Sequence, residues 1–125
     1  MDENGLSNGI IGAAIEVHRH LGPGLLESVY RDCLAYELRS RRVRVETEVL
    51  LPVRYKALEL EAGYRADIVV ERSVIVELKA VDAIVPVFTA QLLSYLRLSS
   101  IKLGLLINFN SVHLKDGIRR VVNNL

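Results

Sequence analysis

The sequence predicts an α/β protein in which helices pack on the faces of a mixed β-sheet. Three observations carry this prediction. Apolar residues recur at helical spacing through the first forty residues, after which runs rich in β-branched residues take over. A further helical stretch then separates two strongly apolar runs, and a strand–helix–strand connection of that length implies two parallel strands joined by a right-handed crossover.

Two helices are expected before the first strand. The first is capped by Ser7 and stopped by the turn at residues 22–24, while residues 1–6 are polar and expected to be frayed. Its apolar positions are Ile10, Ile11, Ala14, Ile15, His18 and Leu21. The second helix follows the turn, and its apolar positions are Leu26, Val29, Tyr30, Cys33, Leu34 and Leu38.

Most of the remaining chain reads as strands. They are expected at residues 43–55, 58–70, 74–78 and 102–109, with a short strand at 112–115 and a terminal amphipathic piece from Ile118. The run 74–78 is almost wholly apolar, as in a strand that is buried on both faces. Pro52 indicates an edge strand or a bulge, and Pro86 opens a third helix over 87–98.

Length and composition indicate one cytoplasmic domain spanning residues 1–125. The net charge is +1, so any nucleic-acid contact must come from local clustering of charge. The single cysteine, Cys33, excludes an internal disulfide and a thiolate zinc cluster. The sequence shows neither a signal peptide nor an apolar run of about 18 residues, so no membrane association is expected.

Two carboxylates and an amine are expected to converge near the middle of the chain. If the turn between two strands comprises residues 71–73, Asp67 lies directly across from Glu77, with Cβ atoms roughly 4.5–5.5 Å apart. A two-residue turn would shift this pairing by one. Strand alternation places Lys79 on the face of Glu77. Such a cluster is costly unless a cation sits in it, which predicts a divalent metal ion.

Four further polar residues are candidates for the same site or have simpler explanations. Glu27 opens the second helix, where an acidic residue is also favoured by the helix dipole. Gln91 and Tyr95 share one face of the third helix, and they are equally well explained as helix surface and core rim. His18 lies on an apolar helical face, where a hydrogen-bonded core histidine is the usual explanation. Oxygen ligands without thiolates favour Mg²⁺ or Mn²⁺ over zinc.

The run Gly24-Leu-Leu-Glu27-Ser-Val-Tyr30 resembles the signature of the GxxExxY protein family. The resemblance extends over nearly the whole chain, through Gly63-Tyr-Arg-Ala-Asp67, Val76-Glu77-Leu78-Lys79, Gln91-x-x-x-Tyr95, Gly104-Leu-Leu-Ile-Asn108-Phe and Lys115-Asp116-Gly117-Ile118. That family is grouped with the PD-(D/E)XK nuclease superfamily, which implies a restriction-endonuclease-like core with a mixed central β-sheet flanked by α-helices. The element Gln91-x-x-x-Tyr95 resembles that of RecB-type exonucleases. The proline of the superfamily's name is replaced by Ala66.

The resemblance also implies a metal site. Asp67 and Glu77 would hold Mg²⁺ or Mn²⁺ together with the main-chain carbonyl of Leu78. Glu27 would complete the ligand shell or hold a second ion. Lys79 would orient the attacking water or neutralise charge on the phosphate.

Three residues are candidates for positioning the substrate. Gln91 and Tyr95 would position the nucleic-acid backbone or support the metal ligands, as the resemblance implies. Arg65 shares the face of Lys79 in the assumed register, which makes it a candidate phosphate contact.

The sequence therefore favours a metal-dependent nuclease that hydrolyses phosphodiester bonds of DNA or RNA, with DNA favoured as the partner. The small size and nearly neutral charge leave little surface for sequence recognition, which favours weak sequence specificity or a homodimer. The competing interpretation is a catalytically silent nucleic-acid-binding or oligomerisation module of the same fold, in which the carboxylates are structural.

Overall fold

The computed structural model describes residues 2–125, which form three helices, five strands and one 3₁₀ turn. In chain order these are α1 (Glu3–Leu21), α2 (Glu27–Ser40), β1 (Val45–Tyr55), β2 (Leu58–Val70), β3 (Val74–Lys79), α3 (Pro86–Ser99), β4 (Leu103–Asn108), η1 (Leu114–Gly117) and β5 (Ile118–Val122). The strands form one sheet in the order β1-β2-β3-β4-β5. β3 and β4 are parallel and the other neighbouring strands are antiparallel, which confirms the predicted mixed sheet.

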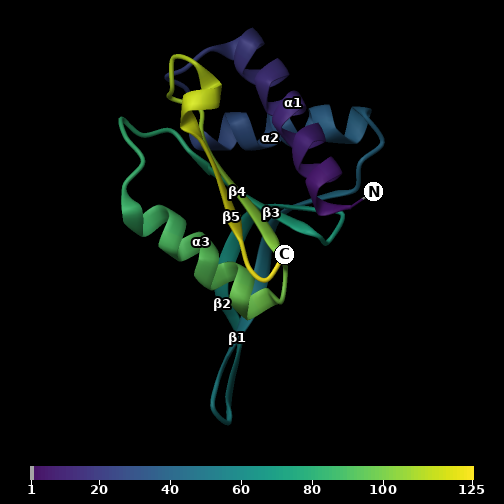
Figure 1. Ribbon diagram of the computed structural model, residues 1–125, viewed down its shortest axis with the longest axis vertical. Coiled ribbons are helices and arrows are strands. Elements are labelled where there is room, and N and C mark those ends of the chain that lie inside the picture. Colours follow the sequence, from purple (N-terminus) through teal and green to yellow (C-terminus); the bar gives the residue numbers. More distant parts are fainter. Residues whose placement is uncertain (1) are drawn as a thin grey trace.

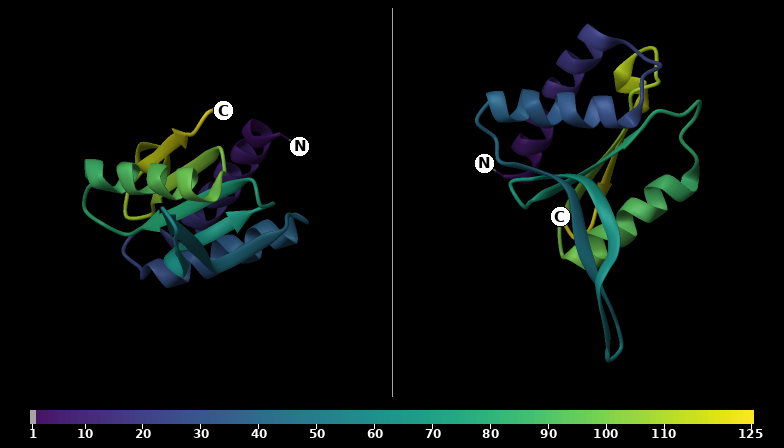
Figure 2. Two further views of the ribbon diagram at one scale, coloured as in Figure 1. Left: turned by 90° about the horizontal axis from the view of Figure 1, so that it is seen from below. Right: turned by 180° about the vertical axis from the view of Figure 1, so that it is seen from behind.

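The sheet lies between two helical layers (Figure 2). α1 and α2 cover one face and enclose the larger core cluster, which includes Ile10, Leu34 and Leu105. α3 covers the opposite face, where Leu92 and Leu96 pack on the sheet. β3 and β4 are buried along nearly their whole length, as predicted for central strands covered on both faces. Among the helices of residues 2–125, none is long and apolar enough to cross a membrane.

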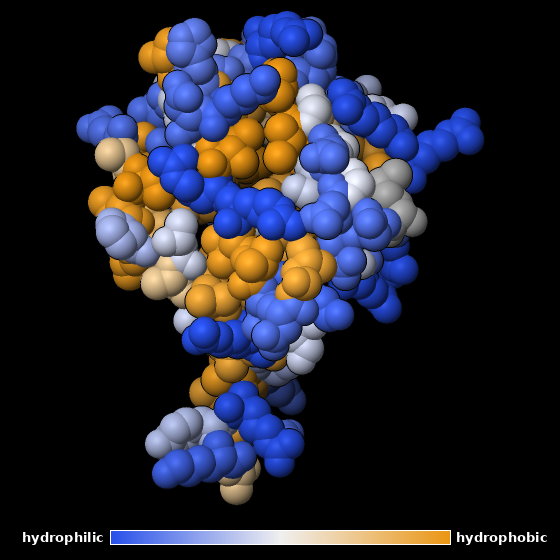
Figure 3. Space-filling model, in the orientation of Figure 1, coloured by the Kyte–Doolittle hydropathy of each residue, from blue (hydrophilic) through white to orange (hydrophobic). Residues whose placement is uncertain are grey.

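β1 and β2 continue past the rest of the sheet as a projecting hairpin (Figure 1). The turn at its tip is formed by Lys56 and Ala57, between the two strands expected at residues 43–55 and 58–70, and the surface there is largely hydrophilic (Figure 3). The interpretation of Pro52 is also confirmed. β1 is an edge strand, and its register with β2 shifts between Leu51 and Val53.

The first helix begins earlier than predicted. α1 starts at Glu3, and Asp2 rather than Ser7 caps it: the Asp2 carboxylate accepts a hydrogen bond of 2.8 Å from the N–H of Gly5. Leu6 and Ser7 are both buried within the helix. Because Leu6 packs into the core, the first turn is stabilised by burial, and the expectation of a frayed segment is wrong for residues 3–6. Met1 lies outside the described residues.

The strand predicted at residues 112–115 is wrong. The chain there forms η1, and the terminal amphipathic piece is the edge strand β5. A Cβ added at Gly117 would lie 2.1 Å from Oγ of Ser111 and 2.7 Å from the carbonyl oxygen of Asn108. The chain therefore folds back on itself through a space that only glycine fits, and this packing overrides the strand propensity of the segment.

A pair of glycine substitutions tests how tightly α3 packs on the sheet. A Cβ at Gly104 in β4 would lie 2.9 Å from Cγ of the buried Leu92, whereas a Cβ at Gly9 in α1 meets nothing within 4 Å. We expect Gly104→Ala to lower the free energy of unfolding by about 1–3 kcal/mol through overpacking. Gly9→Ala is expected to raise it by about 0.5–1 kcal/mol, because alanine favours a helix interior. Urea unfolding monitored by circular dichroism measures both, and an unchanged Gly104→Ala midpoint would contradict the packing.

Candidate active site

The turn between β2 and β3 sets which residues face each other. Val70 pairs with Val74 and Ile68 with Val76, so the turn comprises three residues, which excludes the two-residue alternative. The next positions in this register are Asp67 and Glu77. The expected juxtaposition of the two acidic residues is therefore present.

At these positions side-chain carboxylates, rather than backbone carbonyls, accept hydrogen bonds from the backbone N–H groups. The N–H of Asp67 donates a hydrogen bond of 3.2 Å to Oε1 of Glu77, and the N–H of Leu78 donates one of 2.9 Å to Oδ2 of Asp67. Beyond this point β2 pairs only with β1 and diverges from β3 as part of the hairpin. The two carboxylates thus lie at a fork in the sheet and are each anchored by a main-chain N–H group.

An irregularity in β1 reorients β2 at the same point. Glu48, opposite Asp67, has a positive φ of 51° and interrupts the pairing between Thr47 and Val49. Ala66 and Val69 consequently both pack in the cluster beneath α3, although strict alternation would place them on opposite faces. Asp67 lies within this irregular segment of β2.

Burial is the largest influence on the pKa of Glu77. Glu77 is only 7% exposed. Burial raises the pKa of Glu77 to about 8, and the neighbouring negative charge of Asp67 acts in the same direction. The Asp67 N–H and the Lys79 ammonium lower the pKa of Glu77 but do not offset these causes. The surroundings of Glu77 therefore hold too little positive charge to keep both carboxyl groups ionised at neutral pH.

Lys79 is held by the first turn of α3. It follows Glu77 by two residues in β3 and is half-buried. Its Nζ lies 4.4 Å from the centre of the Phe88 ring, which is a cation–π contact. Phe88 was not among the residues predicted for the site. An aromatic residue in the first turn of the third helix is a weak signal, because only the packing of α3 on the sheet brings it to Lys79.

Tyr95 lies on the α3 side of the carboxylate pair. Burial raises the pKa of its hydroxyl, and the negative charges of Glu77 and Asp67 raise it further, so the hydroxyl remains protonated. Its ring stacks on that of Tyr64 at 4.1 Å between ring centres, and the Tyr64 hydroxyl donates a hydrogen bond of 2.9 Å to the Tyr95 carbonyl oxygen. Gln91, one turn earlier in α3, is exposed.

Tyr64 is a site residue that the sequence analysis missed. It belongs to the quoted run from Gly63 to Asp67, but strict alternation places residues 64 and 67 on opposite faces of a strand. The irregularity at Glu48 brings Tyr64 to the α3 side, where it supports Tyr95.

The expectation that Arg65 shares the face of Lys79 is wrong. Its Nη1 lies 3.6 Å from Oε2 of Glu48, whose other carboxylate oxygen lies 2.8 Å from Nη1 of Arg31 in α2. Arg65 is therefore on the α2 side of the sheet, whereas Lys79 contacts α3. The irregularity at Glu48 explains why Arg65 lies on the opposite side of the sheet from Lys79. The Arg65 side chain is 60% exposed.

Glu27 lies at the correct end of the sheet but apart from the carboxylate pair. It is the first residue of α2 and is exposed. One turn later, the ring of Tyr30 stacks on Phe109 at 4.5 Å, and the N–H of Phe109 donates a 2.9 Å hydrogen bond to the carbonyl oxygen of Lys79. No group of three or more His, Cys, Asp or Glu side chains within residues 2–125 is arranged to hold a metal ion. The structure thus brings Asp67 and Glu77 together and does not gather Glu27 with them.

His18 is a partly buried histidine with a hydrogen-bond partner. Its Nε2 lies 2.8 Å from the carbonyl oxygen of Ser111, and its ring is tilted against that of Phe109. These contacts agree with the interpretation of His18 as a satisfied core residue.

Comparison with known proteins identifies the family. A family model described as "PD-(D/E)XK nuclease superfamily" matches residues 4–121. The chain belongs to the PD-(D/E)XK nuclease superfamily. This confirms the restriction-endonuclease-like α/β fold. Nucleases of this superfamily generally use divalent metal ions.

One solved structure supports the fold. The PD-(D/E)XK chain matches a structure entitled "Crystal structure of SSO0001" with a TM-score of 0.56 and 23% sequence identity. The match covers 78% of this chain and 50% of that one, so the chain spans about half the length of that protein. Among the curated proteins, no significant match is found.

The residues of this PD-(D/E)XK site fit a divalent cation. Asp67 and Glu77 present hard carboxylate oxygens, which Mg²⁺ and Mn²⁺ prefer. The raised pKa of Glu77 means that a neighbouring cation would be needed for both groups to be ionised at neutral pH. The order Ala66-Asp67 and then Glu77-Leu78-Lys79 follows the order of residue types in the superfamily's name, with alanine instead of proline.

Proposed function

We propose that this PD-(D/E)XK protein is a metal-dependent nuclease that hydrolyses phosphodiester bonds, with DNA favoured over RNA and without strong sequence specificity. The observation that carries the proposal is the buried Glu77 beside Asp67, with Lys79 on the same strand. The residues quoted from Gly24 to Tyr30 and from Gly63 to Asp67 support membership of the GxxExxY family within the superfamily.

The proposed metal ligands are Asp67, Glu77 and the main-chain carbonyl of Leu78, with Mg²⁺ or Mn²⁺ as the ion. A bound divalent ion would supply Lewis acidity toward the phosphodiester. The N–H groups of Asp67 and Leu78 hold the two carboxylates in place, so little reorganisation is needed when a cation arrives. Glu27, at the same end of the sheet as Lys79, would complete the shell when substrate is present.

Lys79 is proposed to stabilise negative charge that develops on the phosphate. Phe88 holds its ammonium group beside the carboxylate pair and limits its freedom before substrate binds. Tyr95, which the structure keeps protonated, is a hydrogen-bond donor for the substrate, with Gln91 next to it on α3. Arg65 is proposed to contact a phosphate on the α2 side of the fork rather than beside Lys79.

Low sequence specificity and self-association are further parts of the proposal. A domain of 125 residues with a net charge of +1 offers little surface for reading bases. A homodimer would double the nucleic-acid contacts of such a small protein.

A catalytically silent nucleic-acid-binding or oligomerisation module is the second candidate. One observation favours it: among residues 2–125, no third acidic side chain joins Asp67 and Glu77 as a possible metal ligand. In that case the pair is a structural remnant, and divalent ions would not affect the protein.

Calorimetric titration of Mn²⁺ separates the two candidates. We expect the wild type to bind Mn²⁺ in the presence of a noncleavable oligonucleotide, whose phosphate oxygens complete the ligand shell. Asp67→Ala should lose this binding, because it removes a carboxylate at the centre of the site. Asp116→Ala, which removes an exposed carboxylate in η1, is the matched control and should bind like the wild type. Absence of Mn²⁺ binding by the wild type with the oligonucleotide present would favour the silent module.

A further inference from the structure

α2 has a second apolar face that the fold leaves uncovered. Tyr30, Leu34, Ala35 and Leu38 face the sheet and are buried. On the outer side, Leu26 and Tyr36 are 72% and 76% exposed, Val29 is 37% exposed and Cys33 is half-buried. These four outer residues are spaced by three, four and three positions, which is the spacing of the seam of a helix pair. We call them the α2 seam.

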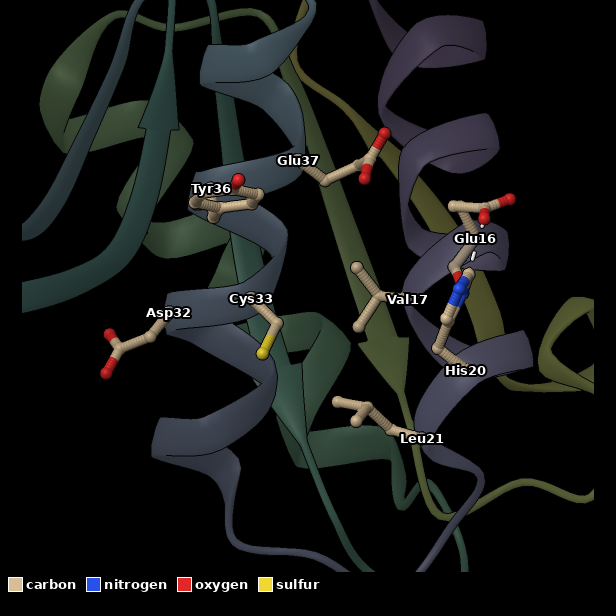
Figure 4. A pocket seen from close by; sticks show the side chains of 8 residues that line it. All are labelled: Glu16, Val17, His20, Leu21, Asp32, Cys33, Tyr36 and Glu37. Atoms are coloured by element: carbon tan, nitrogen blue, oxygen red, sulfur yellow. Dashed lines mark hydrogen bonds and ion pairs between the residues drawn. The ribbon is translucent and has the colours of Figure 1, made fainter.

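A hollow lies directly beside the α2 seam (Figure 4). It has a volume of about 380 Å³ and opens between α1 and α2. Val17, Leu21 and Cys33 form its apolar lining, while Glu16 and Glu37 lie at its rim. An apolar side chain from a partner would be removed from water there, at about 25 cal/mol for each Å² buried.

We propose that the α2 seam pairs antiparallel with the α2 seam of a second copy of this chain. The positions of the seam are symmetric about residue 31. An antiparallel pair centred there places Leu26 opposite Tyr36 of the partner subunit and Val29 opposite Cys33 of the partner subunit, and the reverse. Leu26 of one subunit then reaches the hollow of the other. Such self-complementarity is what a two-fold symmetric interface requires.

Charge complementarity supports a second copy as the occupant. Within residues 2–125, no side chain caps the N-terminus of α2, where Leu26 occupies the cap position. The same alignment places Glu37 of the partner subunit opposite Leu25, next to this uncapped helix start. A carboxylate near the positive end of a helix dipole is stabilising. Within one subunit, Glu37 also forms an ion pair of 2.9 Å with Arg41 of the same helix.

The proposed interface leaves the candidate active site accessible. Glu27 and Tyr30 are three residues apart and lie on the sheet-facing side of α2, away from the seam. The carboxylate pair and Lys79 lie on the α3 side of the sheet. The location of the interface rests on the proposed homodimer but not on the proposed chemistry, so its test needs neither metal nor nucleic acid.

The first measurement is the mass of the protein in solution by sedimentation equilibrium. The interface is small, so we expect a dimer with a dissociation constant of about 1–100 µM, near the weak end for specific association. Leu26→Glu and Tyr36→Glu should each shift the protein to monomer, because they place a carboxylate in an apolar contact. Ser28→Glu adds the same charge on an exposed position off the seam and should dimerise like the wild type. A wild type that stays monomeric throughout this range would overturn both the homodimer and its interface.

Disulfide cross-linking tests the alignment itself. Val29→Cys places a thiol opposite the native Cys33 of the partner subunit, so oxidation should give a covalent dimer on a non-reducing gel. Ser28→Cys, one residue away and off the seam, should give no more covalent dimer than the wild type. Adding Cys33→Ala to Val29→Cys should abolish the cross-link. A dimer by sedimentation without this pattern would overturn the α2 interface while leaving the homodimer in place.

Discussion

Glu77→Gln is expected to abolish nuclease activity and at the same time to stabilise the metal-free protein. Glutamine keeps the shape of the side chain but removes the negative charge that the proposed metal ion requires, so activity with Mg²⁺ or Mn²⁺ should fall by about 100-fold or more. The same charge is buried and lies next to Asp67, so its removal relieves a cost when no metal is bound. Thermal unfolding in a chelator and a nuclease assay with added metal measure the two effects.

The stabilisation should depend on pH in a specific direction. The folded protein raises the pKa of Glu77 from its ordinary value of 4.5 to about 8. Between these pH values the folded state binds more protons than the unfolded state, so the metal-free wild type loses stability as the pH rises from about 5 to about 8. The cost is on the order of a few kcal/mol at the upper end. Glu77→Gln should remove this part of the pH dependence, so its advantage should be largest near pH 8.

A matched substitution separates the local effect from a general change in charge. Glu61→Gln makes the same chemical change at an exposed position of β2, on the projecting hairpin, and should leave activity and the pH dependence as in the wild type. A Glu77→Gln protein that is less stable than the wild type at pH 8 in chelator would contradict the electrostatic account. Retention of full activity in that variant would contradict the proposed metal ligand.

Lys79→Ala is expected to remove catalysis while preserving nucleic-acid binding. Loss of a single charge placed at the reacting phosphate typically costs about 100- to 1,000-fold in rate. Binding of a noncleavable oligonucleotide should change by only a few-fold, because most affinity comes from contacts along the backbone. Lys79→Arg should not restore the rate, because the planar guanidinium places its charge differently above the Phe88 ring. Single-turnover cleavage and fluorescence anisotropy measure the two quantities.

The matched control for Lys79 is Lys102. It is exposed just before β4, at the opposite end of the parallel strand pair, where Leu103 lies beside Val74. Lys102→Ala should cleave and bind like the wild type. If Lys79→Ala retained the wild-type cleavage rate, Lys79 would have no catalytic role, and equal losses of binding and cleavage would make it a binding residue only.

The spacing of apolar residues predicted a helix or strand correctly where it follows one period, either helical or alternating. The strand expected at residues 58–70 and the helix opened by Pro86 match β2 and α3 closely, and the three-residue turn between β2 and β3 is present. The errors fall where packing competes with local preference. Burial of Leu6 extends α1 past the expected cap, and the close approach of Gly117 to Ser111 turns the chain where a strand was predicted.

For the candidate site, the sequence by itself determined that Glu77 and Lys79 share a strand face, because strand period acts over a few residues. The pairing of Asp67 with Glu77 required a three-residue turn, and the register of β2 with β3 decided that turn length. Only the tertiary structure decided the environment of that pair. The raised pKa of Glu77 arises from burial beneath α3, and the contact of Phe88 with Lys79 depends on how α3 packs on the sheet. The faces of Tyr64 and Arg65 depend on one irregularity at Glu48, on the neighbouring strand. Burial and strand irregularities arise from contacts between segments far apart in the sequence, so the spacing of neighbouring residues cannot predict them.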